Sequence, residues 1–268
     1  MAEIICPVCS GILERQEGGL RCPLGHNFDI ARQGYYNLLT VSQKRSLHPG
    51  DTRDMVAARR RFLDTGAYLP IAEAVCGLIK TYGAGENILD AGCGEGYYTA
   101  KVKESLTSGA FQGIDVSKEA VRFASARYKD ITWICGTAAH LPFLDGSISC
   151  LMSMFALTVP GEFHRVLEKN GIFLQVLAGE DHLLGLKNII YPELHRKEKV
   201  LHPSYEGFTL LESRELSFQF TAEGGGVQDL LAMTPHVWRI SGEGAQRLKE
   251  TERLTDTAQV ILNVFRRE

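Results

Sequence analysis

The feature that most constrains the fold of this chain is a glycine-rich turn in its first half. The apolar segment Asn87–Ala91 has the length of a strand and runs directly into Gly92-Cys93-Gly94-Glu95-Gly96. A segment with helical character then begins at Tyr97. Glycines at such a junction let the backbone turn sharply and approach a bound ligand closely. The turn therefore predicts a parallel sheet with a ligand crevice at the ends of its strands.

Strand-like and helix-like segments alternate along the chain. Apolar segments typical of buried strands lie at 87–91, 110–116, 131–135, 148–155 and 172–177. Helices are expected at 51–63, 70–82, 97–106, 117–128 and 163–167. The last two strand-like segments, 208–220 and 258–265, alternate like an antiparallel pair closing one edge. This order predicts an α/β fold built on a doubly wound, Rossmann-like sheet.

Two carboxylates indicate which ligand the turn would hold. Asp90 lies two residues before Gly92, and Gly96 comes too early for the Gly-x-Gly-x-x-Gly pattern of dinucleotide sites. A carboxylate beside the turn repels a pyrophosphate but suits the cationic amino-acid end of S-adenosylmethionine. Asp115 ends the second predicted strand, where a carboxylate can take both ribose hydroxyls, although a helix-capping turn also accounts for it.

These features favour a class I methyltransferase over a dehydrogenase. The predicted cofactor-binding residues of the turn and the next strand are Asp90, Gly92, Gly94, Glu95, Gly96 and Asp115. Leu141 follows the third predicted strand, in a loop that borders the ligand crevice of such sheets. We expect it to cover the adenine, but ordinary packing accounts for a leucine at this position equally well.

Four residues of metal-ligand type stand close together near the start of the chain, with the spacing Cys6-x2-Cys9-x12-Cys22-x3-His26. Three thiolates and one imidazole complete a tetrahedral zinc site, and a site with four protein ligands is structural and closed. The alternative, a set of unpaired thiols, is disfavoured by the paired spacing. Because so small a module buries little core, its folding should depend on the metal. We expect a chelator to unfold residues 1–37 without melting the larger domain.

The sequence divides into a zinc module at 1–37, a linker with helices at 38–84 and a methyltransferase domain at 85–268. The net charge of −3 excludes an overall positive field for nucleic acid, so basic groups must act locally. No run of 18 apolar residues and no signal peptide is found, so we expect a cytoplasmic protein without a membrane partner. We interpret one basic group as contacts to RNA, although a solvated helix face is equally consistent: Lys44, Arg45, Arg59, Arg60 and Arg61.

Further short motifs accompany the zinc ligands and the glycine turn. They include Gly34-Tyr35-x-Asn37-Leu38-Leu39, Lys44-Arg45-Ser46, Pro49-Gly50-Asp51, Phe62-Leu63-Asp64-x-Gly66-x-Tyr68, Glu193-Leu194-His195, Glu206-Gly207-Phe208 and Met233-Thr234-Pro235. With these motifs, the chain resembles the bacterial 23S ribosomal RNA (guanine-N1)-methyltransferases of the RlmA (RrmA) family over nearly its whole length.

The resemblance implies transfer of a methyl group from S-adenosylmethionine to N1 of a guanine in a hairpin of 23S rRNA. It also implies a zinc module and linker that help to recognise the hairpin, a homodimer, and no DNA partner. Cofactor contacts are implied for Tyr68, Gly94, Glu95 and His182, with Asp115 at the ribose. From the residues alone, His182 is only a solitary histidine after the fifth predicted strand.

Two departures from the family pattern concern the substrate side. Leu157 stands where relatives commonly have the proline of an Ala-Pro pair, and Ser149 where related enzymes have an acid. No catalytic base can be named, and Glu95 and His182 are weak candidates. A small-molecule methyltransferase is an alternative, which the zinc module and basic linker disfavour. A non-catalytic, zinc-bearing RNA-binding protein is another, which the intact glycine turn disfavours.

Overall fold

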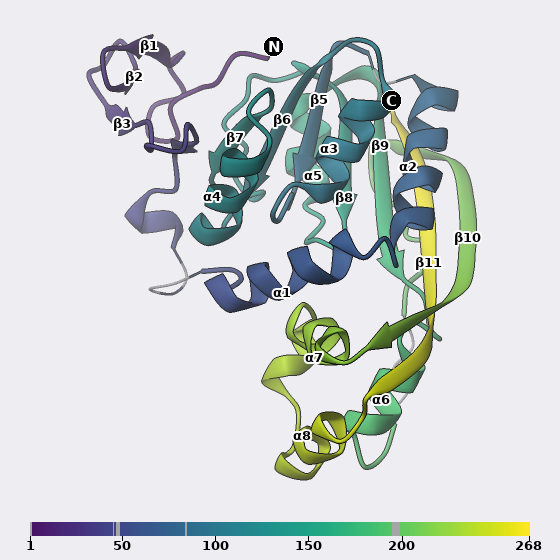
Figure 1. Ribbon diagram of the computed structural model, residues 1–268. Coiled ribbons are helices and arrows are strands. Elements are labelled where there is room, and N and C mark those ends of the chain that lie inside the picture. Colours follow the sequence, from purple (N-terminus) through teal and green to yellow (C-terminus); the bar gives the residue numbers. More distant parts are fainter. Residues whose placement is uncertain (1, 45, 47–48, 84, 195–198) are drawn as a thin grey trace.

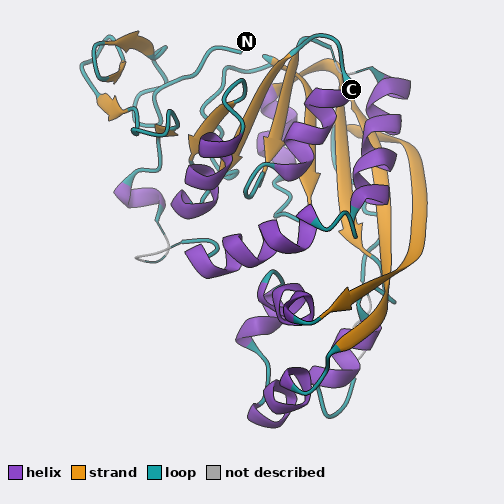
Figure 2. Ribbon diagram, in the orientation of Figure 1, coloured by secondary structure: helices purple, strands orange, loops and turns teal. Residues whose placement is uncertain are grey.

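The computed structural model describes residues 2–44, 46, 49–83, 85–194 and 199–268. Within these residues, the centre of the molecule is one mixed sheet with the strand order β10-β11-β9-β8-β5-β6-β7-β4 (Figures 1 and 2). Its strands are β4 (Tyr36–Asn37), β5 (Asn87–Ala91), β6 (Ala110–Asp115), β7 (Thr132–Cys135), β8 (Ile148–Met154), β9 (Leu167–Ala178), β10 (Phe208–Glu223) and β11 (Arg253–Arg267).

The sheet confirms the predicted α/β class and its antiparallel edge. Strands β4 to β9 pair in parallel, whereas β11 pairs antiparallel with both β9 and β10. The strand order reverses between β5 and β8, because β6 lies on one side of β5 and β8 on the other. In open α/β sheets, a ligand crevice forms at such a switch point, outside the carboxyl ends of the strands.

Helices and the zinc module cover the two faces of this sheet. The helices are α1 (Arg53–Asp64), α2 (Leu69–Tyr82), α3 (Tyr97–Ser105), α4 (Lys118–Arg127), α5 (Pro160–Val166), α6 (Leu184–Ile190), α7 (Gly225–Ala232) and α8 (Gly242–Lys249), with short 3-10 turns η1 (Val41–Gln43) and η2 (Pro235–Trp238). One core joins α2, α3 and α4 to the sheet through residues such as Val75, Val102 and Val121. The second core joins α5 to the zinc module on the opposite face.

The zinc module is a small three-stranded sheet of β1 (Glu14–Gln16), β2 (Gly19–Arg21) and β3 (Asn27–Asp29). It lies beside the edge of the main sheet that β7 and β4 form (Figure 1). The Ile5 amide donates to the Pro142 carbonyl at 2.9 Å, and the Gln112 side-chain amide donates to the Ala2 carbonyl at 3.2 Å. Because β4 also pairs with β7, the first 37 residues share hydrogen bonds and a core with the larger domain.

The predicted helix boundaries hold with small shifts. The helix predicted from residue 117 begins with Ser117 as its cap, since the Ser117 hydroxyl accepts the Ala120 amide. Asp51 does not begin α1; Thr52 caps that helix by accepting the Met55 amide. Among the described residues, no single helix is long and apolar enough to cross a membrane. The helices α1 and α2 would reach the required length and apolar composition only if they were taken together, and the chain bends by 82° at the break between them.

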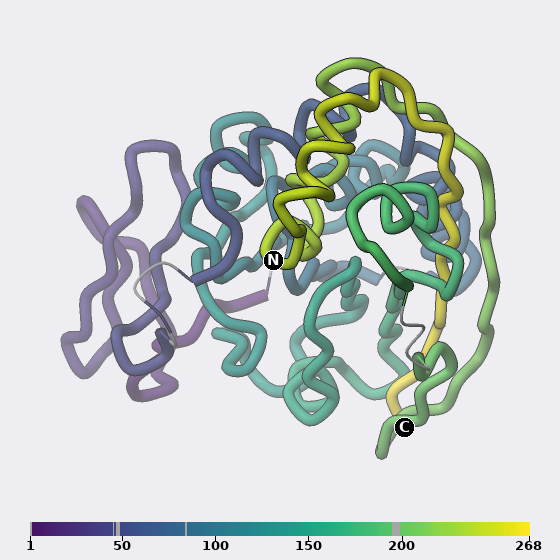
Figure 3. The backbone as a smooth tube through the Cα atoms, turned by 90° about the horizontal axis from the view of Figure 1, so that it is seen from below, coloured from purple at the N-terminus to yellow at the C-terminus, as the bar shows by residue number. Residues whose placement is uncertain are grey.

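The sequence did not predict α6, α7 or α8. The segment between β10 and β11 carries α7, η2 and α8, and α7 packs against α1 while α8 packs against α6. These helices lie beyond the ends toward which the parallel strands point (Figure 1). Figure 3 looks onto this end of the sheet, with the zinc module on one side and the α6–α8 segments opposite. Of these segments, α6 and η2 contribute residues to the lining of the cavity described below.

Candidate active site and zinc centre

A cavity of 1560 Å³ opens at the carboxyl ends of the central parallel strands. Its floor is the glycine turn after β5, with Asp115 from the end of β6 and the loop 137–140 after β7. The segments after β8 and β9 contribute Phe155 and His182, and α1, α6 and η2 close the outer side. The crevice that the sequence predicted is therefore open and lies at the switch point of the sheet.

The three glycines of the turn have different roles. All have positive φ, at 89° for Gly92, 56° for Gly94 and 87° for Gly96, which a residue with a side chain rarely adopts. Gly92 and Gly94 line the cavity. Gly96 does not line it, because a Cβ at this position would lie 2.5 Å from the indole of Trp133. Gly96 thus serves the packing at the start of α3 rather than contacting a cofactor, contrary to the sequence-based expectation.

Asp90 offers a negative group at the base of the cavity. Its Oδ2 accepts the Thr99 hydroxyl at 2.5 Å, while its buried Oδ1 has no hydrogen-bond partner among the described residues. Burial raises the pKa of Asp90 to about 7. A buried carboxylate oxygen without a hydrogen-bond partner destabilises the folded protein unless a ligand supplies that partner. The ammonium or sulfonium end of S-adenosylmethionine has the charge required, so these residues fit the predicted cofactor.

Asp115 is oriented by backbone amides. Its Oδ2 accepts the Gly94 amide at 2.9 Å and its Oδ1 accepts the Ser117 amide at 2.7 Å. Each oxygen keeps a second lone pair, and the carboxylate lines the cavity. Because Ser117 itself caps α4, that helix does not require Asp115 as its cap. The ribose role predicted for Asp115 remains a prediction, and its position is compatible with it.

Arg59 lies inside the cavity wall and not on a free helix face. Its Nη1 forms an ion pair with Asp51 at 2.5 Å, and its Nη2 donates to the Met233 carbonyl at 3.1 Å. It also approaches Glu95, whose pKa is raised to about 7 by burial although the Arg59 charge opposes that shift. Arg59 therefore lines the cavity, and the RNA contact expected for it from sequence stays a prediction.

The other basic residues of the linker differ among themselves. Arg60 lies 3.6 Å from Asp64, and Arg61 forms a bidentate pair with Asp229 at 2.8 and 2.5 Å. Lys44 is exposed after η1, and Arg45 lies outside the described residues. The three consecutive arginines of α1 therefore point to three separate partners. An RNA contact for Lys44, Arg45, Arg60 and Arg61 stays a prediction.

Tyr68, His182 and Phe155 form an aromatic wall. The His182 Nδ1 accepts the Gln259 amide at 3.3 Å, so its proton sits on Nε2, which faces the Tyr68 hydroxyl at 3.5 Å. Burial lowers the pKa of His182 to about 3, which keeps the ring neutral. The Phe155 ring stacks on His182 with centroids 5.9 Å apart. All three residues line the cavity, and the cofactor contacts that the resemblance implies for Tyr68 and His182 stay predictions.

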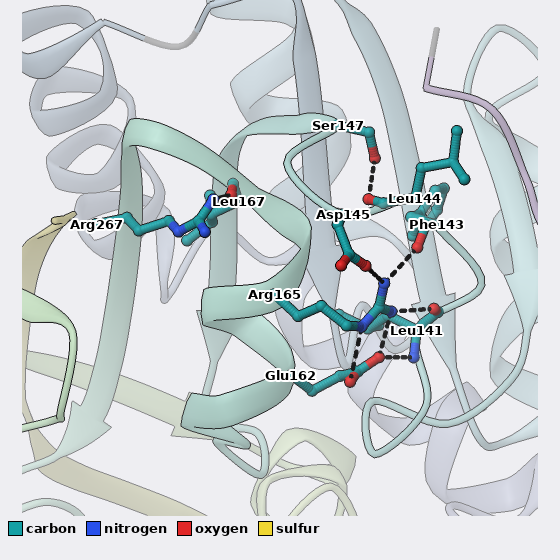
Figure 4. A network of polar contacts seen from close by, with 9 residues as sticks. All are labelled: Leu141, Phe143, Leu144, Asp145, Ser147, Glu162, Arg165, Leu167 and Arg267. Carbon is teal, nitrogen blue, oxygen red and sulfur yellow. Dashed lines mark hydrogen bonds and ion pairs between the residues drawn. The ribbon is translucent and has the colours of Figure 1, made fainter.

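Leu141 does not line the cavity, so it is not the expected cover for an adenine. Its side chain is 2% exposed and belongs to the core shared with the zinc module. Figure 4 shows the reason for this position. Arg165 donates to the Leu141 and Phe143 carbonyls at 2.8 Å, and Glu162 accepts the Leu141 amide at 2.8 Å. These bonds turn the leucine inward, and only the preceding residues 137–140 face the cavity.

The four predicted zinc ligands converge. The ligand atoms of Cys6, Cys9, Cys22 and His26 all lie within 4.8 Å of one another. The Cys9–Cys22 sulfur distance is 3.5 Å, and the His26 Nδ1 lies 3.3 Å from the Cys22 sulfur and 3.6 Å from that of Cys6. A tetrahedron with zinc–ligand bonds of about 2.0–2.3 Å has edges of roughly 3.6 Å. The donor set and its spacing therefore fit a structural zinc ion.

Sequence reasoning missed the outer wall of the cavity. Asp51, Thr99, Met233 and Trp238 take part in the site or line it, but none was selected as a site residue. Asp51 and Met233 belong to the Pro49-Gly50-Asp51 and Met233-Thr234-Pro235 motifs that helped to carry the family resemblance, so these two motifs were the available signals. The place of Met233 in the cavity wall depends on the path of the chain between β10 and β11.

Comparison with known proteins supports the combination of a zinc module with a methyltransferase domain. Residues 4–47 match the family model described as RlmA, N-terminal, and residues 88–171 match a model of a methyltransferase domain. A crystal structure from Bacillus halodurans, provisionally assigned as a methyltransferase, shares the fold with a TM-score of 0.50 and 18% identity, over 72% of this chain and 97% of its own.

Two curated bacterial proteins extend the similarity to almost the whole chain. The 23S rRNA (guanine(748)-N(1))-methyltransferase of Streptomyces fradiae is 33% identical over 91% of this chain and 89% of its own. A Bacillus subtilis (strain 168) protein, provisionally named a 23S rRNA (guanine-N(1)-)-methyltransferase, is 30% identical over 95% of this chain and 94% of its own. With its zinc-ligand cluster and its S-adenosylmethionine crevice, the chain belongs to the family of 23S rRNA (guanine-N1)-methyltransferases.

Proposed function

We propose that this enzyme transfers the methyl group of S-adenosylmethionine to N1 of a guanine in a hairpin of 23S rRNA. The observation that carries the proposal is the joint presence of a Cys3His cluster and an open cofactor crevice in one packed unit. A small-molecule methyltransferase needs only the crevice. The names of the two relatives described above give 23S rRNA as their substrate. Their similarity to this chain extends over both the zinc module and the methyltransferase domain.

The residues that line the cavity have different roles in this reaction. When bound, S-adenosylmethionine supplies an activated methyl group on a positively charged sulfur. Asp90 and Glu95 offer negative charge to its cationic end, and Asp115 is placed for hydroxyl groups. The chain then has to hold the guanine edge in line with the methyl group and exclude water, because positioning supplies most of the catalysis for an activated donor.

The guanine N1 must also lose a proton, and the two candidate bases differ. His182 is a poor base, since its Nδ1 already accepts the Gln259 amide and its other nitrogen carries the proton. Glu95 is 4% exposed, lines the cavity and has a pKa raised by burial to about 7, close to physiological pH. A base is most effective when its pKa lies near the working pH, so Glu95 is the better candidate.

We also propose that the enzyme works in the cytoplasm as a homodimer. The cytoplasmic location follows from the substrate, because ribosomal RNA is made and assembled there. The homodimer rests on the family resemblance, and a second zinc module would widen the surface offered to a hairpin. Light scattering of the zinc-loaded protein without RNA should give twice the 29.7 kDa mass of one chain. A mass of one chain would contradict the dimer.

Methyl transfer itself tests the main proposal. The purified enzyme is incubated with tritiated S-adenosylmethionine and 23S rRNA from a strain that lacks this modification. We expect label in one guanine, which primer extension locates because a methyl group on N1 blocks base pairing. Label in a small-molecule extract but not in RNA would support the small-molecule alternative. Cofactor binding without any transfer would support the non-catalytic alternative.

A further inference from the structure

An exposed tryptophan stands at the mouth of the cofactor cavity. Trp238 ends η2 and is 68% exposed, yet it lines the same cavity as the glycine turn. The other tryptophan of the chain, Trp133, is 2% exposed and lies in the core under Gly96. Isolated apolar side chains are common on protein surfaces, but those gathered at the mouth of a binding site mark a place where a partner binds.

Trp238 is not alone at this mouth. Leu157 is 71% exposed and Phe155 is 40% exposed, and both line the same cavity from the segment after β8. Phe155 has a positive φ of 54°, a strained conformation for an aromatic residue, and such strain is concentrated at functional sites. The mouth of the cavity thus offers apolar surface from two separate segments of the chain.

The backbone around Trp238 is held firmly while its ring is left free. The Tyr191 hydroxyl lies 2.8 Å from the His236 Nδ1, and the two rings meet edge to face. On the other side, the Arg59 guanidinium donates to the Met233 carbonyl. A ring presented from a fixed backbone loses little conformational entropy when it binds a partner. This arrangement is expected of a platform rather than of a loosely placed surface residue.

The charge next to Trp238 indicates the kind of partner. Arg239 is exposed and forms no ion pair within the described part of the chain. An aromatic face beside an unpaired arginine is the combination with which proteins bind single-stranded nucleic acid, through base stacking and a phosphate contact. The cavity, at 1560 Å³, also exceeds the roughly 300–1,000 Å³ of small-molecule sites, so its mouth has room for nucleotides beside a cofactor.

We propose that Trp238 stacks on an unpaired base of the RNA substrate, next to the guanine that enters the cavity, and that Arg239 contacts the phosphate of that nucleotide. This role of Trp238 and Arg239 rests on the proposed function in one respect, namely that the substrate is RNA. It assigns to the segment between β10 and β11 a direct part in substrate binding. That segment would then recognise the region around the target from the side opposite the zinc module.

Tryptophan fluorescence tests the stack directly. The zinc-loaded full chain, with S-adenosylhomocysteine present, is titrated with unmodified 23S rRNA. We expect RNA to quench the emission, because a stacked base quenches an exposed indole while the buried Trp133 is shielded. Trp238→Phe should bind RNA almost normally and show no quenching. Trp238→Leu should bind roughly 5- to 100-fold more weakly, the range for loss of one base–aromatic stack.

Two further measurements distinguish base stacking from a general surface effect and from a contact with the cofactor. Val200→Ala, which changes an apolar residue that is 75% exposed and outside the cavity lining, should bind RNA as the wild type does. Affinity for S-adenosylhomocysteine by calorimetry should stay unchanged in Trp238→Leu, and an equal loss there would place Trp238 in the cofactor site and overturn the stack. Normal methyl transfer with unaltered RNA affinity in Trp238→Leu would also overturn it, while leaving the proposed function intact. A wild type that methylates no RNA would instead refute the proposed function.

Discussion

At the scale of single residues, Asp115 gives the sharpest test of the cofactor site. Asp115→Ala removes a charged acceptor for the Gly94 amide and the group that we expect at the ribose. Hydrogen bonds to a charged group contribute about 1.5–3 kcal/mol, so affinity for S-adenosylmethionine should fall roughly 10- to 100-fold by calorimetry. Asp130→Ala is the matched control, since Asp130 is exposed, pairs with Lys103 and lies outside the cavity lining. Unchanged affinity in Asp115→Ala would rule out the ribose role.

The buried acids of the cavity predict a pH dependence. Burial raises the pKa values of Asp90 and Glu95 to about 7, so both lose protons between pH 6 and 8. The ionised forms attract the ammonium and sulfonium charges, so affinity for S-adenosylmethionine should rise over this window and level off above it. S-adenosylhomocysteine keeps the ammonium group but lacks the sulfonium charge, so its affinity should rise by a smaller factor. Glu95→Gln should flatten the profile for S-adenosylmethionine, and wild-type affinities that do not change with pH for either ligand would contradict the electrostatic role.

The same two acids affect stability with the opposite sign. A carboxyl whose folded pKa is raised favours the folded state while protonated, and this contribution is lost as pH rises from the unfolded value near 4 to about 7. Without cofactor, Glu95→Gln should therefore stabilise the protein at pH 8 relative to wild type, by roughly 1–3 kcal/mol at most. Urea unfolding at pH 5 and pH 8 measures it, and an equal effect at both values would contradict the assignment.

At the scale of elements, the loop after β7 separates packing from binding. Leu141→Ala should cost about 2–5 kcal/mol of unfolding free energy, as for other buried leucines, because it opens a cavity in the core beneath the zinc module. Its effect on cofactor affinity should be small, since Leu141 does not line the site. His140→Ala is the matched control, because His140 is exposed, lines the cavity and should leave stability almost unchanged. Loss of cofactor affinity at normal stability in Leu141→Ala would restore the adenine role.

The elements also show what sequence patterns can and cannot predict here. Local chemistry predicted the glycine turn, the helix that starts near Ser117 and the zinc ligands, because each depends on residues close together in the chain. The inward turn of Leu141 and the place of Arg59 in the cavity wall were not foreseen, because nothing local tells which way a loop leucine turns or which arginine of a helix meets an acid outside that helix. The helices between β10 and β11 were missed because they are short and are held in place by contacts with distant parts of the chain, α7 with α1 and α8 with α6.

At the scale of the whole molecule, the zinc module and the cofactor domain form a continuous structure. The module shares a core with α5 and with the loop after β7, and Ile5 donates to the Pro142 carbonyl. Residues 137–140 of that same loop line the cavity, and Arg165 fixes its following part. A mechanical path of packed and hydrogen-bonded groups therefore joins the metal site to the cofactor site.

Removal of zinc should then destabilise both the zinc module and the cofactor domain, which goes beyond the local unfolding expected from sequence alone. We expect a chelator to unfold the module and also to lower the main thermal transition by roughly 5 °C, which corresponds to about 1–3 kcal/mol for a chain of this size. Affinity for S-adenosylhomocysteine should fall severalfold as the loop 137–143 loosens, and added zinc, but not magnesium, should restore both. Scanning calorimetry and titration calorimetry measure the two effects. If the module unfolds while the main transition and the affinity stay unchanged, the shared core does not connect the two sites, and the zinc module folds as an independent unit.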